Sequence, residues 1–268
     1  LVEGASKGEG LGNRFLGQIR QVAAIIHVVR CFNDDNVTHV EGSVDPVRDA
    51  EIIETELLLA DLESLGKQYE KTEKLAKSGG KDDKKKFDVI SRLSKHCNEG
   101  HRARTFRADE DEVAIINSLH LLTQKPILYV SNVDEKEITH EQPGHIVQRL
   151  ADFANKEGNS AIRLCSKLEQ EIAVLSDIER DMFLKEYNLS EPGLYKLIHA
   201  AFKLLDLETF FTGGSKQVRS WTIKEGTIAP DAAGEIHTDF QRGFIKAEVY
   251  KYDDLVRLGS EKAVKDAG

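Results

Sequence analysis

The sequence lacks the Gly-x-x-x-x-Gly-Lys-Ser/Thr loop whose backbone amides hold the phosphates of a bound nucleotide. Cysteine is scarce: Cys31, Cys97 and Cys165 are far apart and have neither zinc-site spacing nor a disulfide framework. A reducing compartment is therefore expected. No apolar run approaches the roughly 20 residues that cross a bilayer, so we expect no membrane association.

Basic residues are fewer than acidic ones: the sequence has 37 Lys and Arg and 46 Asp and Glu, which gives a net charge of −9. This balance argues against a protein that coats nucleic acid. A local basic concentration nevertheless occurs at Lys81–Lys86, Lys95, His101, Arg102, Arg104 and Arg107. It is either an RNA-phosphate contact or an ordinary solvated face.

Strands and helices alternate over much of the chain. Apolar runs at Ala24–Phe32, Ile127–Ser131 and Ala161–Cys165 predict buried strands, and residues 146–156 are typical of an amphipathic helix. Alternation of this kind predicts an α/β domain with a parallel sheet, which we assign to residues 1–48 and 115–205.

Residues 49–114 interrupt that domain with a helical pattern. The stripe Leu58, Leu62, Leu65, Tyr69, Thr72 and Ala76 alternates spacings of four and three, which is typical of a coiled coil. Ser78-Gly79-Gly80 ends it, a charged tip at Lys81–Lys86 follows, and a second helix carries Phe87, Ile90 and Leu93. The pattern predicts an inserted helical hairpin.

Residues 206–268 predict a small α+β module. Val218–Ile223 and Phe244–Tyr250 alternate like strands, and residues 232–240 are expected to be helical. His237-Thr238-Asp239-Phe240 has no nucleophile beside it, so a structural role is expected.

Asn132-Val133-Asp134-Glu135 follows the strand at Ile127–Ser131. GTPase-type domains read the base with Asn-Lys-x-Asp at this place, and here Val133 replaces the Lys and Glu135 the Asp. An Asn132 amide can pair with adenine or guanine, and Val133 can pack on the base and leaves its backbone groups for it. The longer Glu135 no longer assures a two-pronged contact with guanine. The alternatives are a strand-ending Asn132 and an exposed Glu135 carboxylate.

Ser166, Lys167 and Leu168 follow the next strand, where such folds place a second base-contacting loop; an ordinary turn is the alternative. Gly4, Gly8, Gly10 and Gly12 suit a mobile switch segment or a plain flexible loop.

His39 lies in the polar loop after the first strand, where an imidazole can position or deprotonate water. An exposed loop histidine is the alternative. His27, inside the apolar strand, is expected to be a core histidine.

The segments LVEGASKGEGLGN at the start, HVVRCF, EPGL, TFFTGG and IHTDFQRGFI resemble the YchF/Obg-like ATPase family, over nearly the whole chain. The resemblance implies a P-loop NTPase (GTPase-like) parallel sheet, an inserted helical hairpin and a C-terminal β-grasp (TGS) domain. It maps Asn132 and Val133 onto adenine contacts and His39 onto a functional histidine. It also places Leu1 where GTPases carry the glutamine that orients water.

By the same resemblance the chain is expected to be truncated at both ends. The intact protein is then an ATP-binding and ATP-hydrolysing switch that associates with ribosomes, and with RNA through the hairpin and TGS domain. Mg²⁺ is expected, with ligands outside these residues, and the fragment itself is expected to be inactive. We expect a cytoplasmic monomer, or an organellar one if a targeting peptide was lost. The alternatives are a ribosome- or RNA-binding adaptor with little hydrolysis and a GTPase of relaxed base selectivity.

Overall fold

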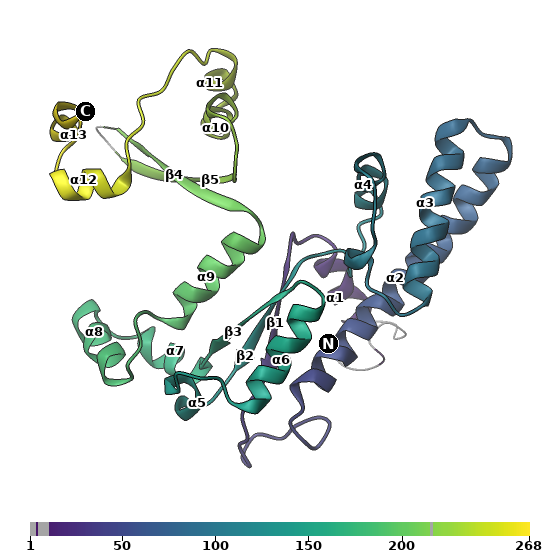
Figure 1. Cartoon of the computed structure of the whole chain (residues 1–268), viewed down its shortest axis with the longest axis horizontal. Helices are drawn as coiled ribbons and strands as arrows, with labels where there is room; N and C mark the ends of the chain where they lie inside the picture. Colours follow the sequence, from purple (N-terminus) through teal and green to yellow (C-terminus); the bar gives the residue numbers. More distant parts are fainter. Residues whose placement is uncertain (1–3, 5–10, 215–216) are drawn as a thin grey trace. The chain divides into compact units, whose positions relative to one another are not determined.

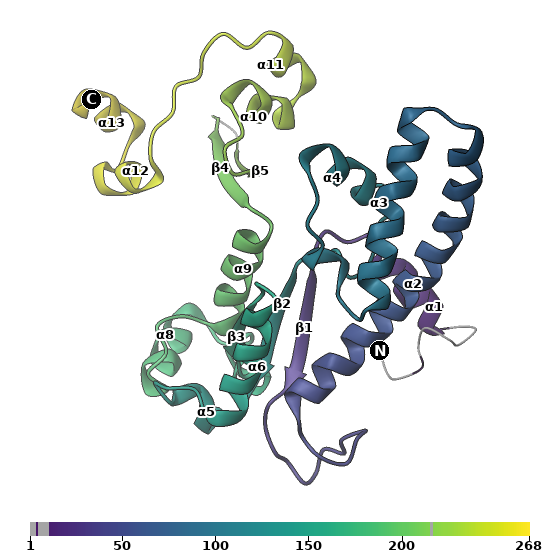
Figure 2. The ribbon, with the colours of Figure 1, turned by 45° about the vertical axis from the view of Figure 1, so that its right-hand side comes forward.

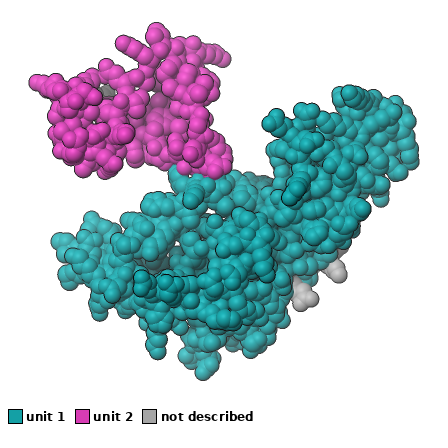
Figure 3. Space-filling model, viewed as in Figure 1, with its two compact units in different colours: residues 1–205 teal, residues 206–268 magenta. Residues whose placement is uncertain are grey.

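The computed structural model describes Gly4, residues 11–214 and residues 217–268. The chain forms two compact units, residues 1–205 and 206–268, which are coloured separately in Figure 3. The first unit is built on a parallel sheet in the order β1-β2-β3, comprising β1 (Ile25–Arg30), β2 (Ile127–Asn132) and β3 (Ser160–Leu164) (Figure 1).

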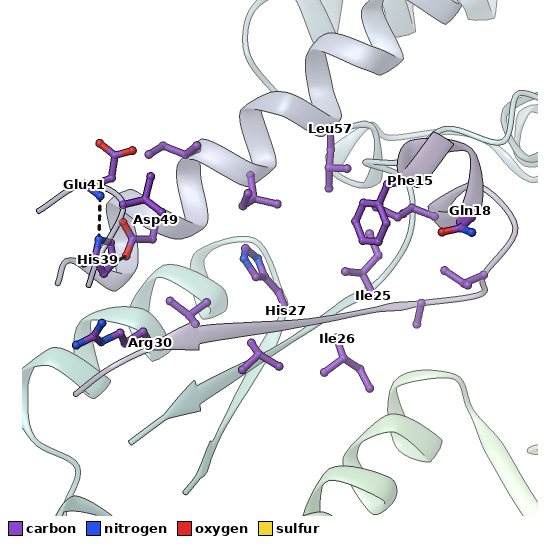
Figure 4. Close-up of a pocket in the computed structure, with 18 residues that line it drawn as sticks. Phe15, Gln18, Ile25, Ile26, His27, Arg30, His39, Glu41, Asp49 and Leu57 are labelled. Atoms are coloured by element: carbon purple, nitrogen blue, oxygen red, sulfur yellow. Dashed lines mark hydrogen bonds and ion pairs between the residues drawn. The ribbon is translucent and has the colours of Figure 1, made fainter. Parts of the chain in front are cut away.

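The central strand β2 is buried along its length from Ile127 to Ser131. The edge strand β1 differs from the sequence prediction of a buried strand, because Ile26 and Val28 are 45% and 57% exposed. Among the described residues β1 pairs with β2 alone, and its side chains alternate between two faces. His27 points toward α2 (Pro46–Ser78), whereas Ile26 points away from it (Figure 4).

Helix α6 (His145–Lys156) covers one face of the sheet. Its buried residues Val147, Leu150 and Ala154 pack with Ile127 and Tyr129 of β2. The other helices of this unit are α1 (Leu11–Ile19), α3 (Lys81–Asn98), the 3-10 helix η1 (Ala103–Thr105), α4 (Glu110–Asn117), α5 (Glu135–Thr139), α7 (Ser166–Ile172), α8 (Asp177–Glu186) and α9 (Gly193–Leu204). None of the helices in the described ranges is long and apolar enough to cross a membrane.

Helices α2 and α3 form the inserted hairpin, which projects from the sheet as two adjacent helices in Figures 1 and 2. Asp45 caps α2 by accepting from the backbone amides of Val47 and Arg48, and Gly79-Gly80 separates the two helices. The expected charged tip belongs to a helix, because α3 already begins at Lys81. The seam of the hairpin buries Leu58, Leu65, Val89, Leu93 and Cys97.

A buried ion network joins the root of the hairpin to the sheet. Glu54 of α2 is fully buried, and its carboxylate accepts from Arg104 Nη2 at 2.6 Å and Arg102 Nε at 3.2 Å. Tyr129 of β2 donates its hydroxyl to the same carboxylate at 3.0 Å. Arg104 also pairs with Glu157 at 2.7 Å. A buried charge needs such partners, so this network sets how α2 meets the sheet.

The second unit pairs β4 (Leu207–Gly213) with β5 (Val218–Lys224) in an antiparallel hairpin. The expected strand at residues 244–250 is absent from the structure. Ile245 and Val249 are 90% and 86% exposed, so no neighbouring strand covers them. The expected helix at 232–240 is two helices that meet at His237. The helices of this unit are α10 (Ala229–Ile236), α11 (Thr238–Arg242), α12 (Tyr252–Leu258) and α13 (Glu261–Ala267).

Candidate nucleotide-binding edge and hydrolytic loop

Two loops meet at the edge of the sheet where β2 and β3 end. Asn132 is the last residue of β2, and its Oδ1 accepts from the backbone amide of Ser166, the first residue of α7, at 3.1 Å. The amide of Val133 donates to the Leu164 carbonyl at 2.9 Å. The structure thus brings the Asn-x-x-Glu loop and the loop after β3 together at the sheet edge where α/β folds bind ligands.

Two of the residues that were predicted near the base have side chains that face the interior. Val133 is 2% exposed and Leu168 is 1% exposed, and both pack in the core with Val147 and Cys165. The expectation that the Val133 side chain packs on a base is therefore wrong for this structure. An apolar side chain next to a buried strand is stabilised more by packing in the core than by lying at the exposed edge of the sheet. Only backbone groups of these two residues can serve a ligand.

Glu135 and Lys167 form an ion pair across the same edge. Lys167 Nζ lies 2.6 Å from Glu135 Oε1, and the side chains are 69% and 37% exposed. The hydrogen bond to Glu135 raises the pKa of Lys167. The neighbouring Asp134 caps α5 by accepting from the Glu137 amide at 2.8 Å. One oxygen of the Glu135 carboxylate, Oε1, therefore pairs with a cation of the protein.

The loop that carries His39 is held by Arg30, the last residue of β1. Its guanidinium donates to the carbonyl oxygens of Phe32, Val37 and Asp34 at 3.0, 2.8 and 3.1 Å. Sequence reasoning missed Arg30, although a cation at the end of an apolar strand was a signal for it. The guanidinium satisfies backbone carbonyls that no regular structure pairs.

Both ring nitrogens of His39 have partners. Nε2 lies 2.8 Å from Oδ2 of Asp49, in the first turn of α2, and Nδ1 accepts from the Glu41 amide at 3.1 Å. The side chains of His39 and Asp49 are 15% and 20% exposed. The alternative of a freely exposed histidine does not hold in this structure. Asp49 is a second residue that sequence reasoning missed.

A pocket of about 630 Å³ lies between β1, α1 and α2. Figure 4 shows Phe15, Ile25 and Leu57 at one end and His39, Glu41 and Asp49 at the other. His27 lies between the two ends, and its ring contacts Tyr129 at a centroid distance of 5.4 Å. Desolvation lowers the pKa of His27 to about 4, so this ring is neutral at pH 7, although the residue is partly exposed and lines the pocket and does not lie in the core.

The glycines of the predicted switch segment are only partly described. Gly8 and Gly10 lie outside the described residues. Gly12 falls in α1 and not in a loop. Gly4 has a φ of +81°, and its amide donates to Oε1 of Glu56 at 2.7 Å. A switch role for this segment stays a prediction.

The basic concentration is smaller than the sequence predicted. Arg102 and Arg104 neutralise Glu54 and Glu157 at the root of the hairpin. Lys85 pairs with Asp111 at 3.0 Å. The exposed basic residues of this region include Lys81, Lys84, Lys95, His101 and Arg107.

The described part of the chain holds no group of three or more His, Cys, Asp or Glu residues that could bind a metal ion. His237 has the structural role that we expected, because its Nδ1 accepts from the Asp239 amide at 3.1 Å and so caps α11.

The parallel sheet and its inserted helical hairpin have the fold of a GTPase-like P-loop NTPase. The chain belongs to the YchF family. It is 47% identical to the "Ribosome-binding ATPase YchF" of Bacillus subtilis and 44% identical to that of Escherichia coli O157:H7, over all 268 residues and 73% of each relative. The solved "Structure of the Schizosaccharomyces pombe YchF GTPase" is similar with a TM-score of 0.83 and 36% identity, over 97% of this chain and 71% of that one. Residues 207–268 match the family model YchF-GTPase_C, described as "Protein of unknown function (DUF933)".

Proposed function

We propose that this protein acts as an ATP-binding and ATP-hydrolysing switch on the ribosome, with Asn132 at the base and His39 at the hydrolytic water. The observation that carries the proposal is the hydrogen bond from the Ser166 amide to Asn132 Oδ1, which joins the two base-reading loops. Because Oδ1 of Asn132 already accepts from the Ser166 amide, the Nδ2–H group of Asn132 is the one that donates to N7 of a purine. The relatives named as ribosome-binding ATPases support the same activity and partner.

The ion pair between Glu135 and Lys167 supports adenine over guanine. Guanine is read when a carboxylate accepts from two base N–H groups, and Oε1 of the Glu135 carboxylate already pairs with Lys167 at 2.6 Å. Adenine lacks those two donors, so it loses nothing when Glu135 is paired. A GTPase of relaxed selectivity would instead need Glu135 to leave Lys167.

Mg²⁺ is proposed to accompany the nucleotide, but the described residues do not fit a metal site of their own. No step is therefore assigned to a metal, and its protein ligands are proposed to lie outside these residues. The protein is further proposed to be a monomer and to work where ribosomes are, in the cytoplasm.

Equilibrium titration with ATP and GTP tests the proposal. Because this sequence has no Gly-x-x-x-x-Gly-Lys-Ser/Thr loop, the titration uses an extended chimera: this chain joined to the residues of the Bacillus subtilis relative that lie outside the match. We expect ATP to bind at least as tightly as GTP. A tenfold preference for GTP, about 1.4 kcal/mol, would contradict the proposed base recognition.

A second candidate function is a ribosome- or RNA-binding adaptor with little hydrolysis. One observation favours it: Lys81, Lys84 and Lys95 are exposed on α3. Co-sedimentation of this chain with ribosomes over a range of salt tests it. Replacing Lys84 and Lys95 by Glu should weaken binding and flatten its salt dependence, whereas Lys156→Glu, an exposed lysine on α6, is the matched control.

A further inference from the structure

His39 is held in one orientation by two neighbours of different chemistry. The Glu41 amide can only donate, so Nδ1 of His39, at 3.1 Å, must be the acceptor nitrogen. Nε2 therefore carries the proton and donates it to Oδ2 of Asp49 at 2.8 Å. The hydrogen-bond network thus assigns the Nε2–H tautomer to the resting ring.

Asp49 is itself fixed on a rigid element. It lies in the first turn of α2, and its Oδ1 accepts from Nε and Nη2 of Arg48 at 3.1 and 2.9 Å. Each oxygen of the Asp49 carboxylate therefore has one side-chain partner: His39 for Oδ2 and Arg48 for Oδ1. Arg48 also donates to the Ser43 carbonyl at 2.5 Å, which ties α2 to the end of the loop that carries His39.

The two contacts of His39 are unequal. The contact with Asp49 joins a carboxylate to a half-buried ring, whereas the contact with Glu41 is an exposed amide within the same loop. For water to reach Nδ1, the Glu41 amide has to give up its contact while Asp49 keeps Nε2. Nδ1 can then accept a hydrogen bond from water.

We infer that Asp49 is the positioning residue of His39: it holds the Nε2–H group, so that Nδ1 presents its lone pair to the hydrolytic water once the Glu41 amide no longer occupies it. This inference rests on the proposed function, in which His39 serves that water. It assigns a role to a carboxylate on the helical insertion, so the hairpin and the hydrolytic loop share one contact. Carboxylates that orient a histidine through its second nitrogen select its tautomer in other hydrolases.

Two measurements test the inference. In the 268-residue chain, ¹H–¹⁵N NMR of the imidazoles should show a hydrogen-bonded Nε2–H of His39 with slow exchange, and Asp49→Ala should abolish that signal. In the extended chimera, Asp49→Ala should lower kcat for ATP by about 10²-fold while Kd stays within about threefold. Asp49→Glu should recover part of kcat, because it restores the carboxylate.

The double variant separates positioning from structure. When His39→Ala is already present, Asp49→Ala should lower kcat no further, because both residues act as one unit. Glu51→Ala is the matched control: it removes an exposed carboxylate two residues further along the same helix and should leave kcat unchanged.

The outcomes distinguish the inference from the proposed function. If Asp49→Ala lowers kcat equally with and without His39, or leaves the Nε2–H signal in place, the inference is overturned. It is also overturned if His39→Ala lowers kcat and Asp49→Ala does not. If His39→Ala itself leaves kcat unchanged, the hydrolytic role proposed for His39 fails and the inference fails with it.

Discussion

Replacing Glu54 by Ala should destabilise the first unit strongly. Its carboxylate is fully buried, 2.6 Å from Arg104 Nη2 and 3.0 Å from the Tyr129 hydroxyl. Removing one partner of a buried ion pair costs about 3–5 kcal/mol, because the remaining charge stays buried. Arg104 keeps Glu157 at 2.7 Å, but Tyr129 Oη loses its acceptor. We therefore expect the free energy of unfolding to fall by about 3–5 kcal/mol.

Urea unfolding followed by two probes measures this effect. The single tryptophan, Trp221, lies on β5 and reports on the second unit, whereas far-UV circular dichroism is dominated by the helices of the first unit. The Glu54→Ala transition should shift in circular dichroism and not in Trp221 fluorescence. Equal shifts of both probes would mean that the two units unfold together.

Two variants calibrate the expected loss. Glu54→Gln can still accept from Tyr129 and loses only the charge, so the free energy of unfolding should fall by about 1–3 kcal/mol. Glu63→Ala breaks an exposed pair with Lys67 on the same helix and should change it by less than about 1 kcal/mol. A loss below about 1 kcal/mol for Glu54→Ala would refute the role given to the network.

Three further predictions concern pH, hydrolysis and the base. The gap between the ordinary His pKa of 6.5 and about 4 for His27 corresponds to about 3 kcal/mol of stability. Because the unfolded chain binds this proton first, that stability is lost as pH falls from about 6.5 to about 4. His27→Phe should flatten the acid limb of a denaturation series, and an unchanged limb would contradict the assignment. In the extended chimera, His39→Ala should lower kcat by about 10²–10⁴-fold with Kd within a few-fold; near-normal kcat in stopped-flow assays would make His39 an ordinary loop residue. Lys167→Met frees Glu135 and should tighten GTP relative to ATP by up to about fivefold, or about 1 kcal/mol. Competition titration measures this ratio, with Lys156→Met as the control, and an unchanged ratio would mean that the ion pair does not decide base selectivity.

Local sequence patterns determined much of the secondary structure. The alternation of spacings after Leu58 and the Gly79-Gly80 break predicted the helical hairpin, which the structure shows as α2 and α3. The runs before Asn132 and Ser166 predicted strands of one parallel sheet, and both strands are present. Such features are local because helix and strand periodicity is set by neighbours along the chain.

The predicted strand at residues 244–250 does not form, because a strand also depends on partners outside its own sequence. Its residues alternate correctly, but a strand exists only where another strand supplies hydrogen-bond partners. Ile245 and Val249 are almost fully exposed, so alternation alone does not produce a strand there.

The amino-acid sequence by itself placed Asn132 and Ser166 at the carboxyl ends of strands, and His39 in the loop that follows a strand. Only the tertiary structure shows that the side chains of Val133 and Leu168 lie in the core. It also shows the ion pair between Glu135 and Lys167 and the hydrogen bond between His39 and Asp49. The same holds for Glu54 and Arg104, which are 50 residues apart. Spacing along the chain carries no signal for these contacts, because packing between elements decides which side chains are buried and which charges meet.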